Sequence, residues 1–169
     1  MPSRAAAVPE GYNAVMPYLR VRGGLEAVDF YKRAFGAKKR MHLMMPDGRL
    51  GHAELEIGGS IVMLSDEFPE MGIVGPKALK GVSATFAIYV ADCDKATAKA
   101  VAAGAKVLSP PTDEFYGDRT AKIEDPFGHV WSLQHQREKL TTREMQKRLD
   151  RMMAEAPTPA TPAKSKRKT

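Results

Sequence analysis

The sequence predicts an α+β protein of two tandem βαβββ units, whose curved mixed sheets pair around a cup, followed by a C-terminal helix and a disordered tail. The first observation is an internal repeat: residues 16–21 and 59–64 match residues 85–90 and 128–133 at one offset of 69 residues. The second is the alternation of apolar and polar residues in these segments, which is typical of strands. The third is a helix-like stretch in each copy that ends in Gly-Ala-Lys, at 36–38 and 104–106.

Composition excludes several classes of protein. The chain has 169 residues, 43% hydrophobic and 27% charged, which is ordinary for a globular domain and incompatible with disorder throughout. No stretch approaches the roughly 18 apolar residues of a membrane helix, and the start lacks a signal peptide, so we expect a soluble cytoplasmic protein without membrane partners. The single cysteine, Cys93, excludes disulfide scaffolds and zinc fingers.

The first unit is expected to span residues 12–65. Its helix, at 25–35, has apolar residues at mostly helical spacing, and Gly36 supplies the C-terminal stop. Turns are predicted at 46–48 and 58–59. The strands are expected near 16–21, 38–45, 51–57 and 60–65.

The second unit, residues 83–135, repeats this order after a linker at 66–82. Its helix is expected near 94–103, and its strands near 85–90, 106–109, 118–124 and 129–134. Together the units form a domain over 12–137, preceded by a flexible N-terminus at 1–11. The linker is a candidate rim for a cavity.

A short amphipathic helix is predicted within residues 138–155. Thr141 and Glu144 fit a capping box, and an apolar stripe follows at helical spacing. We favour docking of this helix against its own domain; a dimer contact or a methionine-lined ligand lid are the alternatives. The stripe consists of Met145, Leu149, Met152 and Met153.

The net charge of +6 is concentrated at the C-terminus. Residues 137–169 hold ten Lys or Arg against four acids, so the rest of the chain is balanced. Residues 156–169 contain three prolines and no large apolar side chain, which predicts a disordered basic tail. A solvated extension is favoured, and weak nucleic-acid contact through the tail is the alternative.

Strand parity predicts which side chains face the cup. In 51–57, Ala53, Leu55 and Ile57 form an apolar set, which leaves His52, Glu54 and Glu56 on the opposite face. The same register places Phe86 and Trp131 on the helix side. The other residues expected to face the cup are Met16, Tyr18, Arg20, Ile61, Met63, Thr85, Ala87, Tyr89, Thr120, Lys122, Glu124, Val130, Ser132 and Gln134.

His52 and Glu54 are the candidate catalytic pair, because a carboxylate two positions away on one strand face can orient or charge an imidazole. A surface salt-bridge ladder is the favoured alternative. A metal at this pair is a third possibility and needs a further ligand such as Glu124 or His129. His129 lies in a Gly-His turn, for which a structural role is expected.

The segment 110–119 is expected to be a loop that places Tyr116 and Arg119 at the entry to a cup strand. An aromatic ring and a guanidinium suit a planar or anionic ligand. The alternative is that Tyr116 packs on its own hairpin and Arg119 pairs with Asp113 or Asp118. The candidate ligand-binding set is Met16, Tyr18, Arg20, Met63, Thr85, Tyr89, Tyr116, Arg119, Lys122, Glu124 and Ser132.

The tandem unit, with FYKRAFG closing its first helix and DPFGHVWSLQ forming its last hairpin, resembles the vicinal oxygen chelate superfamily of glyoxalases, bleomycin resistance proteins and dioxygenases. The segments HAELEIGGSIVMLSDE and FYGDRTAKIEDPFGHVWSLQ look like its glyoxalase-like branch named after demethylubiquinone methyltransferase. No glycine motif for a nucleotide supports methyl transfer.

The resemblance implies a metal site made by one residue from the first and one from the last strand of each unit. Those positions fall on Met16, Met63, Thr85 and Ser132, which are poor ligands for the metals of this superfamily. We therefore expect no metal and no other cofactor. The implied function is metal-independent binding of a small molecule by a resistance- or sequestration-like homodimer. The alternative is a lyase or isomerase with a noncanonical site around His52 and Glu54.

Overall fold

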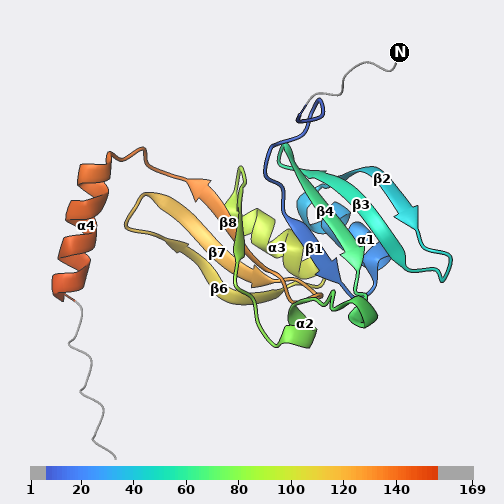
Figure 1. The fold of residues 1–169 in the computed structure, drawn as a ribbon. Coiled ribbons are helices and arrows are strands. Elements are labelled where there is room, and N and C mark those ends of the chain that lie inside the picture. Colours follow the sequence, from blue (N-terminus) through green and yellow to red (C-terminus); the bar gives the residue numbers. More distant parts are fainter. Residues whose placement is uncertain (1–6, 156–169) are drawn as a thin grey trace, which may run out of the picture.

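A computed structural model describes residues 7–155 and shows two four-stranded mixed sheets (Figure 1). The first sheet has the order β1-β4-β3-β2, in which β1 and β4 are parallel and the other pairs are antiparallel. The helix α1 follows β1. The bounds are β1 Tyr18–Val21, α1 Gly24–Phe35, β2 Lys38–Met44, β3 Leu50–Ile57 and β4 Ser60–Asp66.

The second sheet repeats this topology in the order β5-β8-β7-β6. The linker between the sheets forms a short 3-10 turn, η1, and one helical turn, α2. The bounds are η1 Pro69–Met71, α2 Pro76–Leu79, β5 Thr85–Tyr89, α3 Cys93–Ala103, β6 Lys106–Asp113, β7 Asp118–Glu124 and β8 Val130–Gln136. The predicted tandem βαβββ architecture is confirmed.

Two of the differences from the expected boundaries change the place of predicted residues. β1 begins at Tyr18, so Met16 precedes the strand. β6 continues through Pro110 and Pro111, which we expected to lie in a loop. Prolines are tolerated here because β6 is an edge strand, and its register shifts between Ser109 and Thr112.

The helix α1 begins at a polar contact and ends at a glycine. The Asp66 carboxylate accepts hydrogen bonds from the backbone N–H groups of Gly23, Gly24 and Leu50 at 2.8, 2.9 and 2.7 Å. It thereby ties the start of α1 to β3 and β4. Gly36, with φ of 69°, ends α1 in the left-handed conformation, as predicted.

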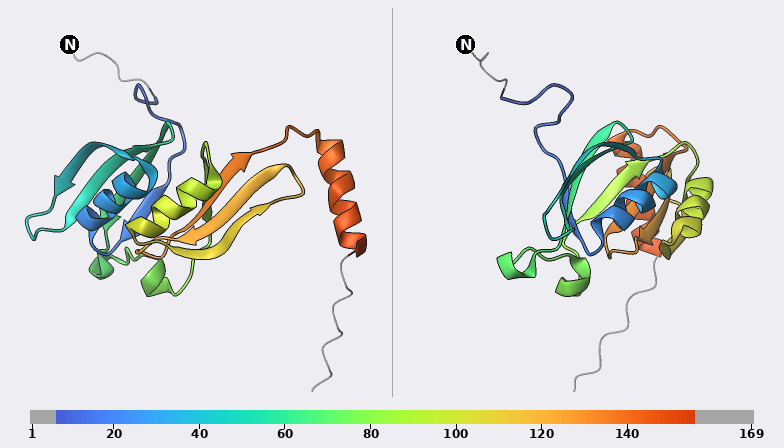
Figure 2. Two further views of the ribbon diagram at one scale, coloured as in Figure 1. Left: turned by 180° about the vertical axis from the view of Figure 1, so that it is seen from behind. Right: turned by 90° about the vertical axis from the view of Figure 1, so that its right-hand side faces the viewer.

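Both helices lie on the same side of the molecule, where α1 and α3 pack against each other over the two sheets (Figure 2). The shared core includes Trp131, which is 3% exposed and lies 5.5 and 4.7 Å from the rings of Tyr31 and Phe35, centre to centre. The predicted place of Trp131 on the helix side is confirmed. Because Trp131 belongs to β8 and the two rings belong to α1, the contact joins the two units.

A buried carboxylate strengthens this junction. Asp125 accepts hydrogen bonds from Tyr31 Oη at 2.7 Å and Trp131 Nε1 at 3.0 Å, and from the backbone N–H groups of Phe127 and His129. The His129 ring lies 3.0 Å from the carbonyl oxygen of Arg20 in β1. His129 therefore has the expected structural role, and it also links the units.

The opposite faces of both sheets are open in the single chain. Every residue of β2 is exposed, and Tyr89 in β5 is 65% exposed. The cup is thus an open surface on each sheet, while Glu54, Thr120 and Ser132 on these faces are buried by their neighbours.

The C-terminal helix α4, Thr142–Glu155, has the predicted capping box. Thr141 N–H donates to Glu144 Oε2 at 2.8 Å, and Glu144 N–H donates to Thr141 Oγ1 at 3.3 Å. The expected docking against its own domain is wrong: α4 stands apart from the sheets (Figure 1) and has no buried residue, with Met153 63% exposed.

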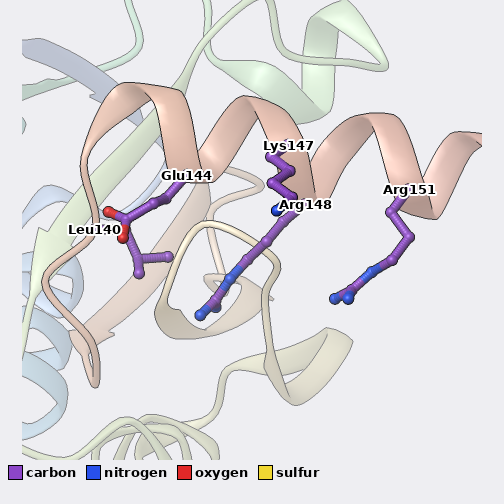
Figure 3. Close-up of a pocket in the computed structure, with 5 residues that line it drawn as sticks. All are labelled: Leu140, Glu144, Lys147, Arg148 and Arg151. Atoms are coloured by element: carbon purple, nitrogen blue, oxygen red, sulfur yellow. The ribbon is translucent and has the colours of Figure 1, made fainter.

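Amphipathic spacing predicts an apolar face but not the surface that covers it. A hollow along α4 is lined by Leu140, Glu144, Lys147, Arg148 and Arg151, and the two arginines extend from the same side of the helix (Figure 3).

Among residues 7–155, no helix is both long and apolar enough to cross a membrane. The predicted basic tail at 156–169 lies outside the described residues.

Candidate ligand-binding site

The predicted pair His52 and Glu54 lies on the open face of the first sheet. A row of side chains crosses the four strands in register, because Tyr18 pairs with Met63, Met63 with Glu54, and Glu54 with Met41. Arg20 lies two residues from Tyr18 in β1, and His52 lies two residues from Glu54 in β3, so both are on the same face. The parity argument therefore places these residues correctly, and the fold brings them together.

Three hydrogen bonds connect this face into one chain. Tyr12 Oη donates to Glu54 Oε2 at 2.6 Å, His52 Nε2 lies 3.4 Å from Glu54 Oε1, and Tyr18 Oη lies 2.8 Å from His52 Nδ1. A carboxylate only accepts, so the contact with Glu54 assigns the imidazole proton to Nε2. Nδ1 is then the acceptor and Tyr18 the donor.

Glu54 is the charged centre of this chain. It is 5% exposed, and the hydrogen bond from Tyr12 is the main cause that lowers its pKa, with contributions from His52 and Arg40, whose Nε lies 4.0 Å away. The same hydrogen bond raises the pKa of Tyr12. Glu54 is therefore ionised at neutral pH and held by donors.

The two glutamates of this strand face have different environments. Glu56 is half-exposed and lies 3.9 Å from Lys38, which fits the solvated salt-bridge ladder considered for the whole face. That interpretation does not fit Glu54, because its carboxylate is buried beneath Tyr12 and Arg40. The ladder thus describes one position and the hydrogen-bonded chain the other.

Arg20 lies beside the chain. Its guanidinium carbon is 3.8 Å from the centre of the Tyr18 ring, and Nη1 donates to Ser65 Oγ at 2.5 Å. Of the three arginines in the strands, Arg40 and Arg119 have a carboxylate within 4.0 Å, and Arg20 has none among the described residues. Its charge is available to a ligand.

The candidates from the second unit lie on the second sheet. Tyr89 Oη donates to Asp118 at 3.1 Å, which raises the pKa of Tyr89. Ser132 pairs with Lys122, whose side chain is exposed. Thr85 and Glu124 both pair with Val130, which lies two residues before Ser132 on the same face of β8. This second group is separate from the chain around His52.

Two candidates of the second unit make mainly local contacts. Arg119 turns toward α3, where Nε and Nη2 donate to Asp94 at 2.6 and 2.8 Å and Nη1 donates to Asp113 at 3.1 Å. Tyr116 lies in the β6–β7 turn, and its ring packs edge-on against Phe115. The alternative of local pairing and packing therefore describes both residues, with Asp94 as the main partner that the sequence did not indicate.

The four residues at the expected metal positions lie in or next to the first and last strands of the two units. Met63 and Ser132 lie in the last strands, Thr85 begins β5, and Met16 precedes β1. Within residues 7–155, no group of three or more His, Cys, Asp or Glu side chains is placed to hold a metal ion. His129, one of the suggested third ligands for His52 and Glu54, contacts Arg20 instead.

Sequence reasoning missed Tyr12 and Arg40, which cover Glu54. Tyr12 comes from the segment before β1, where no periodicity indicates a partner. Arg40 lies at a register shift between Lys39 and Met41, so alternation alone does not predict its direction. The cross-strand neighbours Met41 and Leu43 could have been found by extending the register into β2.

Two βαβββ units with open sheet faces and a buried helix seam define a paired-module protein of the glyoxalase type. Residues 12–133 match the model of the Glyoxalase/Bleomycin resistance protein/Dioxygenase superfamily, and the chain belongs to this family. The matches name the superfamily as a whole, so the narrower branch named after demethylubiquinone methyltransferase stays a prediction.

Relatives support the same assignment. An uncharacterized protein of Mycobacterium bovis is 41% identical over 123 residues, which cover 71% of this chain and 81% of the relative. The structure of a gene product from Arabidopsis thaliana is 32% identical, with a TM-score of 0.60, and covers 72% of this chain and 98% of that one. TioX from Micromonospora sp. ML1 is 26% identical, with a TM-score of 0.58 and coverage of 73% and 98%.

Proposed function

We propose that this protein binds a small organic molecule on its open sheet faces without using a metal. The observation that carries the proposal is the face of the first sheet, where a connected polar chain lies among apolar side chains and ends at Tyr18, which is 41% exposed. Binding sites of this kind combine apolar walls with a few placed polar groups. The side chains at the superfamily's metal positions, two thioethers and two hydroxyls, support metal independence.

We further propose that two copies form a homodimer that closes the open faces. The apolar residues of β2, including Leu43 at 58% exposed, support this, as does the uncovered apolar stripe of α4. Light scattering of the full chain should give twice the mass of a single copy. Substituting Met153→Ser, on α4, should shift the mass toward one copy if α4 contributes, whereas Val101→Ser, on α3, is the matched exposed control.

Metal independence is tested by calorimetry and metal content together. We expect protein purified without a histidine tag to contain less than stoichiometric metal and to show no heat with Zn²⁺, Ni²⁺ or Mn²⁺. Stoichiometric metal that is lost in the double variant His52→Ala, Glu54→Ala would contradict metal independence and establish a relocated site. The double variant Lys38→Ala, Glu56→Ala, from the solvated pair on the same sheet, is the control.

A second candidate function is a lyase or isomerase reaction at His52 and Glu54. The hydrogen-bonded chain favours it, because ionised Glu54 orients His52 and stabilises the imidazolium that forms when Nδ1 takes a proton. Tyr18 would exchange protons with His52 and meet the substrate at the open face. His52→Ala should then abolish turnover without altering the circular dichroism spectrum; unchanged turnover would exclude this role.

A further inference from the structure

An excess positive charge lies on the open face of the first sheet. Glu54 has Arg40 as its cationic neighbour and Glu56 has Lys38, so these four groups balance in pairs. Arg20 adds one further cation, and its hydrogen-bond partner is the neutral Ser65. A guanidinium is suited to bind a carboxylate through two parallel hydrogen bonds.

A hollow of about 220 Å³ opens between β1, β5 and the linker, and Arg20 is one of the residues that line it. Tyr18 and Arg20 form one side, and the linker residues Leu79 and Val82, which are 65% and 42% exposed, contribute to the other. Phe86 also lines it. The linker is thus a cavity rim, as one alternative from the sequence suggested, and the lining is mainly apolar and includes Arg20.

We propose that this hollow binds an apolar organic acid, with its carboxylate on Arg20 and its hydrocarbon body against Leu79, Val82 and Phe86. The inference rests on the proposed small-molecule binding and names the class of ligand. The volume suits an acid with one or two rings. Tyr18 holds the guanidinium in place through its ring, since Arg20 lies 3.8 Å above it, and its hydroxyl stays on His52.

The test compares acids with their neutral amides, because each pair differs mainly in charge. The probes are benzoate with benzamide, 1-naphthoate with 1-naphthamide, and indole-3-acetate with indole-3-acetamide, titrated into the full-length protein by NMR. We expect each acid that binds to do so at least tenfold more tightly than its amide, which corresponds to about 1.4 kcal/mol. Arg20→Gln should remove this preference, and Arg33→Gln, an exposed position on α1, should retain it.

A second variant separates the apolar wall from the charge. Leu79→Gln should weaken an acid and its amide by the same factor, because it alters the wall alone. Should Arg20→Gln fail to fold, Arg20→Lys keeps the charge without the planar fork and should leave a reduced preference for the acid.

The outcomes distinguish the two proposals. Equal affinity for acids and amides in the wild-type protein, or a preference that survives Arg20→Gln, overturns the carboxylate site and leaves small-molecule binding standing. Shifted resonances confined to the second sheet overturn the location. No interaction with any of the six probes counts against small-molecule binding itself and against this inference with it.

Discussion

Replacing Tyr31 with Phe should destabilise the junction between the two units. The substitution keeps the ring that packs on Trp131 and removes the hydroxyl that donates to Asp125 at 2.7 Å. Tyr31 is fully buried and Asp125 is 2% exposed, so water does not replace the lost donor. Asp125 retains three other donors, which limits the loss to that of a single hydrogen bond.

A buried hydrogen bond to a charged group contributes about 1.5–3 kcal/mol, and we expect a loss near 2 kcal/mol for Tyr31→Phe. With a urea dependence of about 2 kcal/mol per molar, the midpoint of unfolding should fall by roughly 1 M. The assay is urea unfolding followed by Trp131 fluorescence at one fixed protein concentration, since oligomerisation would make the midpoint depend on concentration. Tyr116→Phe, in the β6–β7 turn, is the control and should change the midpoint little.

A loss below about 0.5 kcal/mol would refute the reasoning, because it would mean that the hydroxyl adds nothing beyond an ordinary surface contact. A double-mutant cycle with Asp125→Asn tests the pair directly. If the hydrogen bond carries the effect, the two losses should not add, since each single variant already breaks the same interaction.

Three further outcomes follow from the structure. Burial and Asp125 raise the pKa of Tyr31 well above its ordinary value, so the contribution of the neutral phenol is present below pH 10 and is lost as the pH rises above it; Tyr31→Phe should flatten this alkaline loss in pH-dependent unfolding. The lowered pKa of Glu54 predicts a contribution that is present above pH 4.5 and lost as the pH falls through the folded-state pKa, and Glu54→Gln should reduce that acid dependence. Gly75→Ala would press a Cβ into the Arg20 carbonyl oxygen that meets His129, so we expect a loss of about 1–3 kcal/mol in thermal unfolding, and a neutral result would show that the linker shifts freely.

Much of the fold could be predicted because local patterns agree with it. The repeat located both units, Gly36 marked the end of α1, and the alternation in β3 separated His52 and Glu54 from the core. The continuation of β6 through Pro110 could not be predicted, because a proline is compatible with a strand only at a sheet edge, and strand order is not a local property.

The candidate site was predicted in part. Parity along single strands placed Tyr18, Arg20, His52 and Glu54 on one face, and the structure has them there. The prediction of Arg119 as a ligand-facing residue was wrong because it ignored parity: Arg119 is adjacent to Thr120 in β7 and therefore points to the other face, toward Asp94. The position beside a loop outweighed the register in that prediction.

The sequence by itself determined most of the secondary structure, the repeat and the chemistry of each strand face, because these depend on the spacing of neighbouring residues. Only the tertiary structure decided which distant groups meet: Tyr12 over Glu54, Tyr31 on Asp125, and the His129 ring on the Arg20 carbonyl. These contacts join residues 42, 94 and 109 positions apart. Such contacts arise from the packing of whole units, and no local pattern in one segment specifies its partner in another.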